Sequence, residues 1–146
     1  MTTYRTVLNS KIHRASVTQA DLDYVGSISI DEGLLDAAGI AEWEQVSVLD
    51  ITNGSRIETY AILAPRDSGE ICINGAAAHH INPGDLVIIC TYKSIKETTI
   101  SSHSPTIIHV DKSNEIIEIS DAESIYWLDS MVRQTFDDCN GSIKLL

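Results

Sequence analysis

The chain has 146 residues, 43% of them hydrophobic, which is enough for the core of one domain. Its ten Lys and Arg stand against 21 Asp and Glu, and the net charge of -11 argues against binding to nucleic acid or an anionic membrane surface. No apolar run reaches the length of a membrane span and the polar N-terminus lacks a signal-peptide core, so we expect no membrane partner and a cytoplasmic location.

The three cysteines, Cys72, Cys90 and Cys139, are odd in number and form no CxxC pair. This pattern favours reduced, buried thiols over a disulfide framework or a zinc site. The adjacent pair His79-His80 is a poor metal site, because neighbouring side chains diverge and no carboxylate or Cys completes a ligand shell nearby. We therefore expect no metal.

In chain order, the segment up to Thr18 predicts a first strand that is interrupted by a polar cluster around Lys11. Lys11, His13 and Arg14 are consistent either with a solvated strand edge or with the wall of a site. The residues alone leave both interpretations of this basic cluster open.

The dipeptide Gly26-Ser27 can form a reactive bond, because a serine hydroxyl lies close to the carbonyl before it. Glycine would allow the unusual backbone dihedrals that bring the two groups together. Gly-Ser is also common in ordinary turns, so the dipeptide alone carries little weight. The alternation in residues 27–30 predicts a strand with Ile28 and Ile30 facing inward.

A short helix and a hairpin follow. Asp31 is a plausible N-cap for a helix that runs to Ala38, with Gly39 as its terminator. Asn53-Gly54 is a strong hairpin signal, and it predicts an antiparallel pair of strands over residues 46–51 and 56–63.

The second hairpin strand has two distinct faces. Its period of two places Arg56, Glu58 and Tyr60 on one face and Thr59 on the other. Arg binds a carboxylate through a planar fork, and a Tyr that is protonated at neutral pH can donate a proton, so the first face suits an acidic substrate. A surface Arg beside a half-buried Tyr is the alternative interpretation.

The remaining strands are short. A strand over residues 71–73 ends at Asn74-Gly75, and Ala76 to Ala78 are small enough for a ligand to approach the backbone, or for tight packing. We expect strands over residues 86–92, 106–110 and 115–119, and a loop over 93–104. Six or seven such strands predict a mainly β protein built on a small barrel.

The tail from Ser120 carries Ile125, Leu128, Val132 and Phe136 at helical spacing. It predicts a C-terminal amphipathic helix whose wide apolar face contacts a neighbouring subunit. We therefore divide the chain into a barrel domain, 1–119, and a helical tail, 120–146.

Six blocks of the sequence, in order and in register, resemble the pyruvoyl-dependent aspartate 1-decarboxylases. The blocks are Lys11-Ile-His-Arg14, Val17-Thr-Gln-Ala-Asp-Leu22, Asp23-Tyr-Val-Gly-Ser27, Ile51-Thr-Asn-Gly54, Thr59-Tyr60 and Asn74-Gly-Ala-Ala-Ala-His79. The resemblance runs from about Tyr4 to about Ile119, and it gives no role to the tail.

The resemblance implies a double-psi β-barrel, synthesised as a zymogen that cleaves itself between Gly26 and Ser27 into fragments 1–26 and 27–146. Ser27 would become a covalent pyruvoyl cofactor. This lyase would then convert L-aspartate to β-alanine and CO2 through a Schiff base, in pantothenate biosynthesis, as a homotetramer.

The resemblance also implies roles for particular residues. Ser27 and Tyr60 would be catalytic, with Tyr60 as the proton donor, and Thr59 and Asn74 would assist cleavage. Substrate would be bound by Lys11, Arg56, Thr59, Gly75, Ala76 and Ala77. The sequence leaves open which cation holds the retained carboxylate, what His13 does and whether an accessory protein is needed. It also leaves open a barrel that binds an acidic metabolite or partner without cleaving, and a pyruvoyl decarboxylase of another small amino acid.

Overall fold

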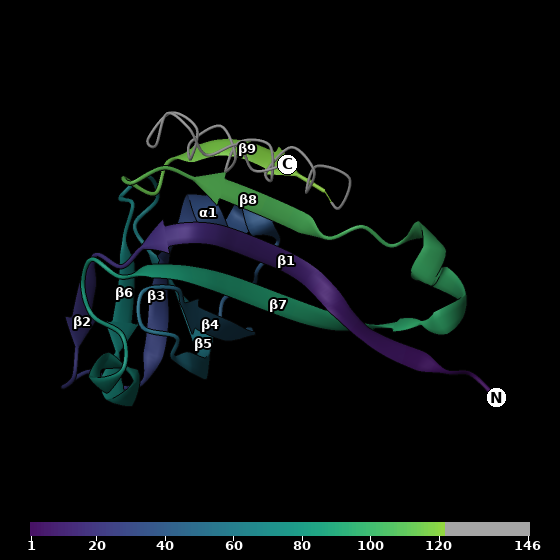
Figure 1. Cartoon of the computed structure of the whole chain (residues 1–146), viewed down its shortest axis with the longest axis horizontal. Helices are drawn as coiled ribbons and strands as arrows, with labels where there is room; N and C mark the ends of the chain where they lie inside the picture. The colour runs from purple at the N-terminus through teal and green to yellow at the C-terminus, as the bar shows by residue number, and fades with distance from the viewer. Residues whose placement is uncertain (122–146) are drawn as a thin grey trace, which may run out of the picture.

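The computed structural model describes residues 1–121, which form nine strands, one short α-helix and two 3-10 helices (Figure 1). The elements in chain order are β1 (Tyr4–Ser16), β2 (Gln19–Asp21), β3 (Ser27–Asp31), α1 (Glu32–Ala38), β4 (Gln45–Asp50), β5 (Arg56–Ala64), β6 (Ile71–Asn74), η1 (Gly75–His79), β7 (Leu86–Lys96), η2 (Glu97–Ser102), β8 (Thr106–Val110) and β9 (Ile116–Ser120). The predicted mainly β class is confirmed.

Most of this sheet closes into a six-stranded barrel, in which β1 and β2 together count as one strand. The strand order is β2-β6-β3-β5-β4-β7-β1-β8-β9. Because β2 follows β1 after only two residues, the two strands behave as one, and the Thr18 N–H bonds to the Ile71 carbonyl between them. The sheet therefore returns to its start, with β8 and β9 added outside the ring through the parallel pairing of β8 with β1. The predicted small barrel is confirmed.

The barrel interior is filled by branched aliphatic side chains from most strands, with Leu34, Leu35 and Ala38 of α1 closing one side. Ile28 and Ile30 are fully buried, as the alternation predicted. Residues that neighbour one another across a sheet point to the same face, so the register decides which polar side chains share the outer surface.

The local predictions for α1 and the β4–β5 hairpin are also confirmed. The Asp31 carboxylate accepts the Gly33 N–H at 2.7 Å, and Gly39 ends the helix with φ of 68°. β4 and β5 pair antiparallel without a register shift, from Leu49 opposite Arg56 to Gln45 opposite Tyr60.

Two predicted boundaries are wrong. β1 continues through Lys11, and its irregularities lie on either side, near Asn9 and between Ile12 and Ala15. Residues 93–104 are not a loop, because β7 extends to Lys96 in register with Tyr4 and η2 follows. In Figure 1 the two long strands run side by side away from the barrel toward the N-terminus. Pairing with a distant strand overrides the polar composition there.

The predicted C-terminal helix and Cys139 lie outside the described residues. The division into a barrel domain, 1–119, and a tail, 120–146, stays a prediction.

Candidate active site

The Gly26-Ser27 bond lies where β3 begins, against the end of β6. Ser27 pairs with Asn74 in the antiparallel β3–β6 register, and its side chain is 1% exposed. The Asn74 amide donates from Nδ2 to the Ser27 hydroxyl at 3.0 Å. The Ser27 hydroxyl in turn lies 3.4 Å from the Val25 carbonyl oxygen, to which it can donate. The serine oxygen is therefore held beside the chain that precedes it.

The glycine that needs an unusual backbone at this site is Gly75. Its φ is 74°, and a Cβ built on it would lie 2.7 Å from the Gly26 Cα. Gly26 itself is not among the residues with positive φ, and a Cβ on it would meet nothing closer than the Asn74 carbonyl at 3.9 Å. The expected distortion at Gly26 is therefore not observed; the close backbone approach is provided by Gly75.

Tyr60 and Thr59 lie on β5, the strand that pairs in parallel with β3. The pairing begins at Ile28 opposite Ala61, so Tyr60 and Thr59 directly precede the first pair on β5, as Ser27 and Gly26 do on β3. β5 pairs with β4 there without a bulge, so the Thr59 side chain stays on the face opposite to that of Tyr60.

The Tyr60 ring is stacked on Trp43, which the sequence analysis did not single out. Their ring centroids are 5.8 Å apart with an interplanar angle of 25°. Trp43 has φ of 73°, and its N–H donates to the Ala61 carbonyl at 2.7 Å, so its backbone is tied to β5. The stack restricts the ring that would transfer the proton.

Lys11 and Arg56 lie on the outer face of the barrel, away from Ser27 in the sheet. Lys11 pairs with Cys90, Cys90 with Ser47 and Ser47 with Glu58, which is two residues from Arg56. Burial raises the pKa of the Cys90 thiol, and the positive charges of Lys11 and Arg56 act in the opposite direction, so both cations lie within electrostatic reach of it. Neither cation has an ion-pair partner within residues 1–121.

A pocket of 500 Å³ opens beside Arg56 and is lined also by Thr6, Gln45, Ser47, Glu58 and Tyr92. The Glu58 carboxylate in this pocket accepts the Ser47 hydroxyl at 2.7 Å and makes no ion pair with Arg56. Arg56 is four residues from Tyr60, about 13 Å along an extended strand. The chain thus separates a cationic region from the reactive bond.

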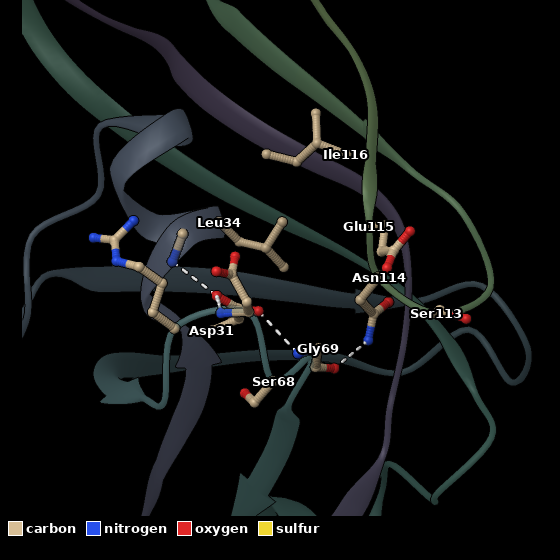
Figure 2. A pocket seen from close by; sticks show the side chains of 11 residues that line it. Asp31, Leu34, Ser68, Gly69, Ser113, Asn114, Glu115 and Ile116 are labelled. Carbon is tan, nitrogen blue, oxygen red and sulfur yellow. Dashed lines mark hydrogen bonds between the residues drawn. The ribbon is translucent and has the colours of Figure 1, made fainter.

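A larger pocket, of 610 Å³, lies between the start of α1, residues 66–69 and residues 113–116 (Figure 2). Its polar groups already bond to the backbone: Asp31 accepts from Gly69 at 2.9 Å, and Asn114 donates to the Gly69 carbonyl at 2.8 Å. None of the residues expected to act at the site lines it, so we do not assign it to the chemistry.

A family model described as aspartate decarboxylase matches residues 3–117. The chain belongs to the aspartate decarboxylase family. A curated relative from Corynebacterium efficiens, named aspartate 1-decarboxylase, is 60% identical over 115 residues, covering 79% of this chain and 85% of the relative. The crystal structure of a computationally designed protein, msDPBB_sym2, covers 58% of this chain and 96% of that protein at 19% identity, with a TM-score of 0.34. A TM-score this low does not support a conclusion about this chain.

In this aspartate decarboxylase family member, the structure brings together Gly26, Ser27, Asn74 and Gly75, while Thr59 and Tyr60 directly precede Ala61, the first β5 residue that pairs with β3. Ala76 is exposed and Ala77 half-buried in η1, which continues directly from Gly75. Lys11 and Arg56 form the separate cationic region. The roles of all these residues stay predictions.

His13 is also placed by the fold. It lies opposite His109 in the parallel β1–β8 pair, with ring centroids 5.9 Å apart, and burial, then the nearby charges of Lys11 and His109, lower its pKa to about 4. A neutral His13 at pH 7 adds no charge beside Lys11.

Within residues 1–121 there is neither a metal-ligating cluster nor a membrane-crossing helix. That part of the aspartate decarboxylase chain holds no group of three or more His, Cys, Asp or Glu placed to bind a metal ion. Nor does it contain a helix long and apolar enough to cross a membrane.

Proposed function

We propose that the protein is a self-processing aspartate 1-decarboxylase whose cofactor is made from Ser27. The observation that carries this proposal is the Ser27 hydroxyl, buried and held by Asn74, next to a Gly26 that packs against the Gly75 backbone. Membership of the family and the relative's name support the choice of reaction.

Self-cleavage needs only the chain's own atoms and water. The Ser27 Oγ attacks the Gly26 carbonyl carbon, its proton passes to the amide nitrogen and the C–N bond breaks, which leaves an ester. Loss of the Cα hydrogen and rupture of the Cβ–Oγ bond release Gly26 as a carboxylate and leave dehydroalanine. Addition of water and loss of ammonia then give a pyruvoyl group at the head of fragment 27–146.

Neighbouring groups fit this reaction. The oxyanion that forms on the Gly26 carbonyl requires a hydrogen-bond donor, and we assign this role to Thr59, which lies two residues before Ala61 on β5, as Gly26 lies two residues before its partner Ile28 on β3. The close contact of Gly75 with Gly26 removes the space into which the preceding segment could move. A fixed geometry of nucleophile and carbonyl lowers the entropy cost of the attack.

The pyruvoyl carbonyl supplies an electron sink for the charge left behind when CO2 departs. Tyr60, beside residue 27 and oriented by Trp43, would donate the proton to the substrate Cα. Lys11 and Arg56, neither of which has an ion-pair partner within residues 1–121, would attract and hold the two carboxylates of L-aspartate. The product would be β-alanine, and the pathway pantothenate biosynthesis. We keep the homotetramer and the cytoplasmic location as part of this proposal.

Intact mass spectrometry of the purified protein tests the proposal. We expect fragments 1–26 and 27–146. The mass of the second fragment should be lower than that of the same fragment with an N-terminal serine, because the serine has become a pyruvoyl group. Ser27→Ala should stay whole. A wild-type chain that stays whole after long warming, with and without cell extract, would mean that the barrel only binds its ligand. A panel of aspartate, glutamate and neutral amino acids then tests the substrate.

A further inference from the structure

Four polar side chains form a cluster on the outer face of β3 and β6, in which Ser27, Cys72 and Asn74 are buried and Ser29 is half-buried. Ser27 lies opposite Asn74, and Ser29 lies opposite Cys72. The alternate residues of both strands, such as Ile28 and Ile73, face the barrel core. Cys72 and Asn74 are each 4% exposed, so any polar group left without a partner in this cluster is costly.

The Asn74 amide is at the centre of the cluster and all of its hydrogen-bonding groups are used. Its Nδ2 donates to the hydroxyls of Ser27 and Ser29, both at 3.0 Å, and its Oδ1 accepts from the Cys72 thiol at 3.2 Å. The reversed amide would direct two N–H groups at one sulfur, which is a weak acceptor, and would leave one hydrogen without a partner. The thiol therefore selects the orientation in which the NH2 faces Ser27.

That orientation suits the change that Ser27 undergoes during cleavage. The Ser27 oxygen begins as a hydroxyl, which both donates and accepts, and becomes an ester oxygen, which only accepts. An NH2 group facing it remains hydrogen-bonded throughout the acyl shift. An amide oxygen facing it would lose its partner and be left against another acceptor.

We propose that Cys72 is a positioning residue for self-cleavage, whose thiol orients the Asn74 amide so that its NH2 holds the Ser27 oxygen through the acyl shift. This inference rests on the proposed function. Cys72 touches neither reacting atom, so it acts only through Asn74.

The protonation of the thiol agrees with this role. Burial raises the Cys72 pKa, and the negative charges of Glu70 and Asp21 raise it further. The thiol therefore keeps at neutral pH the hydrogen that it donates to Asn74.

The test compares cleavage rates of full-length precursors, purified cold and then warmed, by intact mass. Cys72→Ala removes the donor, Cys72→Ser restores one, and Cys90→Ala is a matched control because Cys90 is also 4% exposed and does not bond to Asn74. We expect the cleavage rate of Cys72→Ala to be at least about tenfold lower than that of Cys90→Ala. The cleavage rate of Cys72→Ser should be within about threefold of the wild-type rate. Once cleaved, Cys72→Ala and wild type should differ less in kcat for aspartate than in cleavage rate.

Circular dichroism checks that the variants fold. If Cys72→Ala does not fold, Cys72→Val replaces it, because valine fills the space but cannot donate a hydrogen bond. A donor-free variant that cleaves as fast as Cys90→Ala overturns the inference, as does a Cys72→Ser variant as slow as the donor-free one. In both cases a wild type that cleaves leaves the proposed function standing. A wild type that never cleaves overturns the function and the inference together.

Discussion

The backbone of Gly75 lies directly against that of Gly26, although 49 positions separate them in the chain. A Cβ on Gly75 would come within 2.7 Å of the Gly26 Cα, 2.8 Å of its nitrogen and 2.9 Å of the Tyr24 carbonyl. All three are backbone atoms, so no flexible side chain could move aside. The loop that carries the reactive bond is thus packed on the first residue of η1.

We therefore expect Gly75→Ala to displace residues 24–26 and to slow self-cleavage by more than about tenfold, since a small misplacement of reacting groups costs rate steeply. Gly39→Ala is the control, because Gly39 has a similar φ of 68° but nothing within 4 Å of a Cβ. Both variants should lose about 1 kcal/mol of stability from the left-handed backbone. Equal cleavage rates in the two would show that the contact with Gly26 is unimportant. Intact mass against time measures the rates.

Thr59 and Tyr60 should separate genetically, because they face opposite sides of β5 and are assigned to different steps. Thr59→Val keeps the shape and removes the hydroxyl, so we expect a chain that stays uncleaved. Tyr60→Phe should cleave normally and lose roughly 10²–10⁴-fold in kcat, the usual contribution of a positioned general acid. Mass and β-alanine release measure the two steps. The opposite pattern, with Tyr60→Phe uncleaved and Thr59→Val fully active, would reverse the roles.

Arg56 should matter for turnover and not for cleavage, because it lies about four residues along β5 from the reactive bond. We expect Arg56→Ala to process normally and to lose about 2–3 kcal/mol, or roughly 30- to 160-fold, in kcat/KM for aspartate. The loss should be smaller for a neutral amino acid. Arg66→Ala is the control, since Arg66 is an exposed arginine paired with Glu32 and Asp36 on α1. Steady-state kinetics measure both variants, and equal kinetic constants would show that the exposed Arg56 does not bind the substrate.

The sequence predicted correctly those features that depend on residues close to one another in the chain. Asp31 and Gly39 cap α1, and Asn53-Gly54 turns the β4–β5 hairpin, because capping and turn chemistry act over a few residues. The alternation of Ser27 to Ile30 also showed correctly which side faces the core. The resemblance to a family supplied the candidate residues, which periodicity could not.

The sequence did not reveal the contacts that depend on which strands pair and in which register. The β3–β6 register places Cys72 and Ser29 on Asn74, and no local pattern reports that register. The same holds for Trp43 on Tyr60 and for the extension of β7 along β1. A two-residue period told us that Ser27 and Ser29 share a face, but not what lies opposite them.

The last prediction concerns a pair of buried carboxyl groups, Asp50 at the end of β4 and Asp85 directly before β7. Asp50 Oδ1 accepts the N–H groups of Thr52 and Asn53, while Oδ2 has no N–H or O–H donor in the described part of the chain. Burial, then the neighbouring Asp85 carboxyl, raise the Asp50 pKa from 3.8 to about 6. Two carboxyl groups can share a hydrogen bond only when one of them is protonated.

Because the folded pKa of Asp50 is raised, its contribution to stability is full below pH 3.8 and is lost as the pH rises through about 6. Asp50→Asn can still accept both backbone N–H groups and can donate permanently to Asp85. We therefore expect this variant to be more stable than wild type by about 1–3 kcal/mol at pH 8, with the difference shrinking toward pH 4.

Asp111→Asn is the matched control: Asp111 also accepts two backbone N–H groups, from Ser113 and Glu115, but it is exposed. Urea unfolding between pH 4 and 8 measures both differences, and subtracting wild type at each pH removes the titration of other groups, including His13. An Asp50→Asn variant whose advantage is absent at pH 8, or is the same at every pH, would show that the two carboxyl groups do not share a proton.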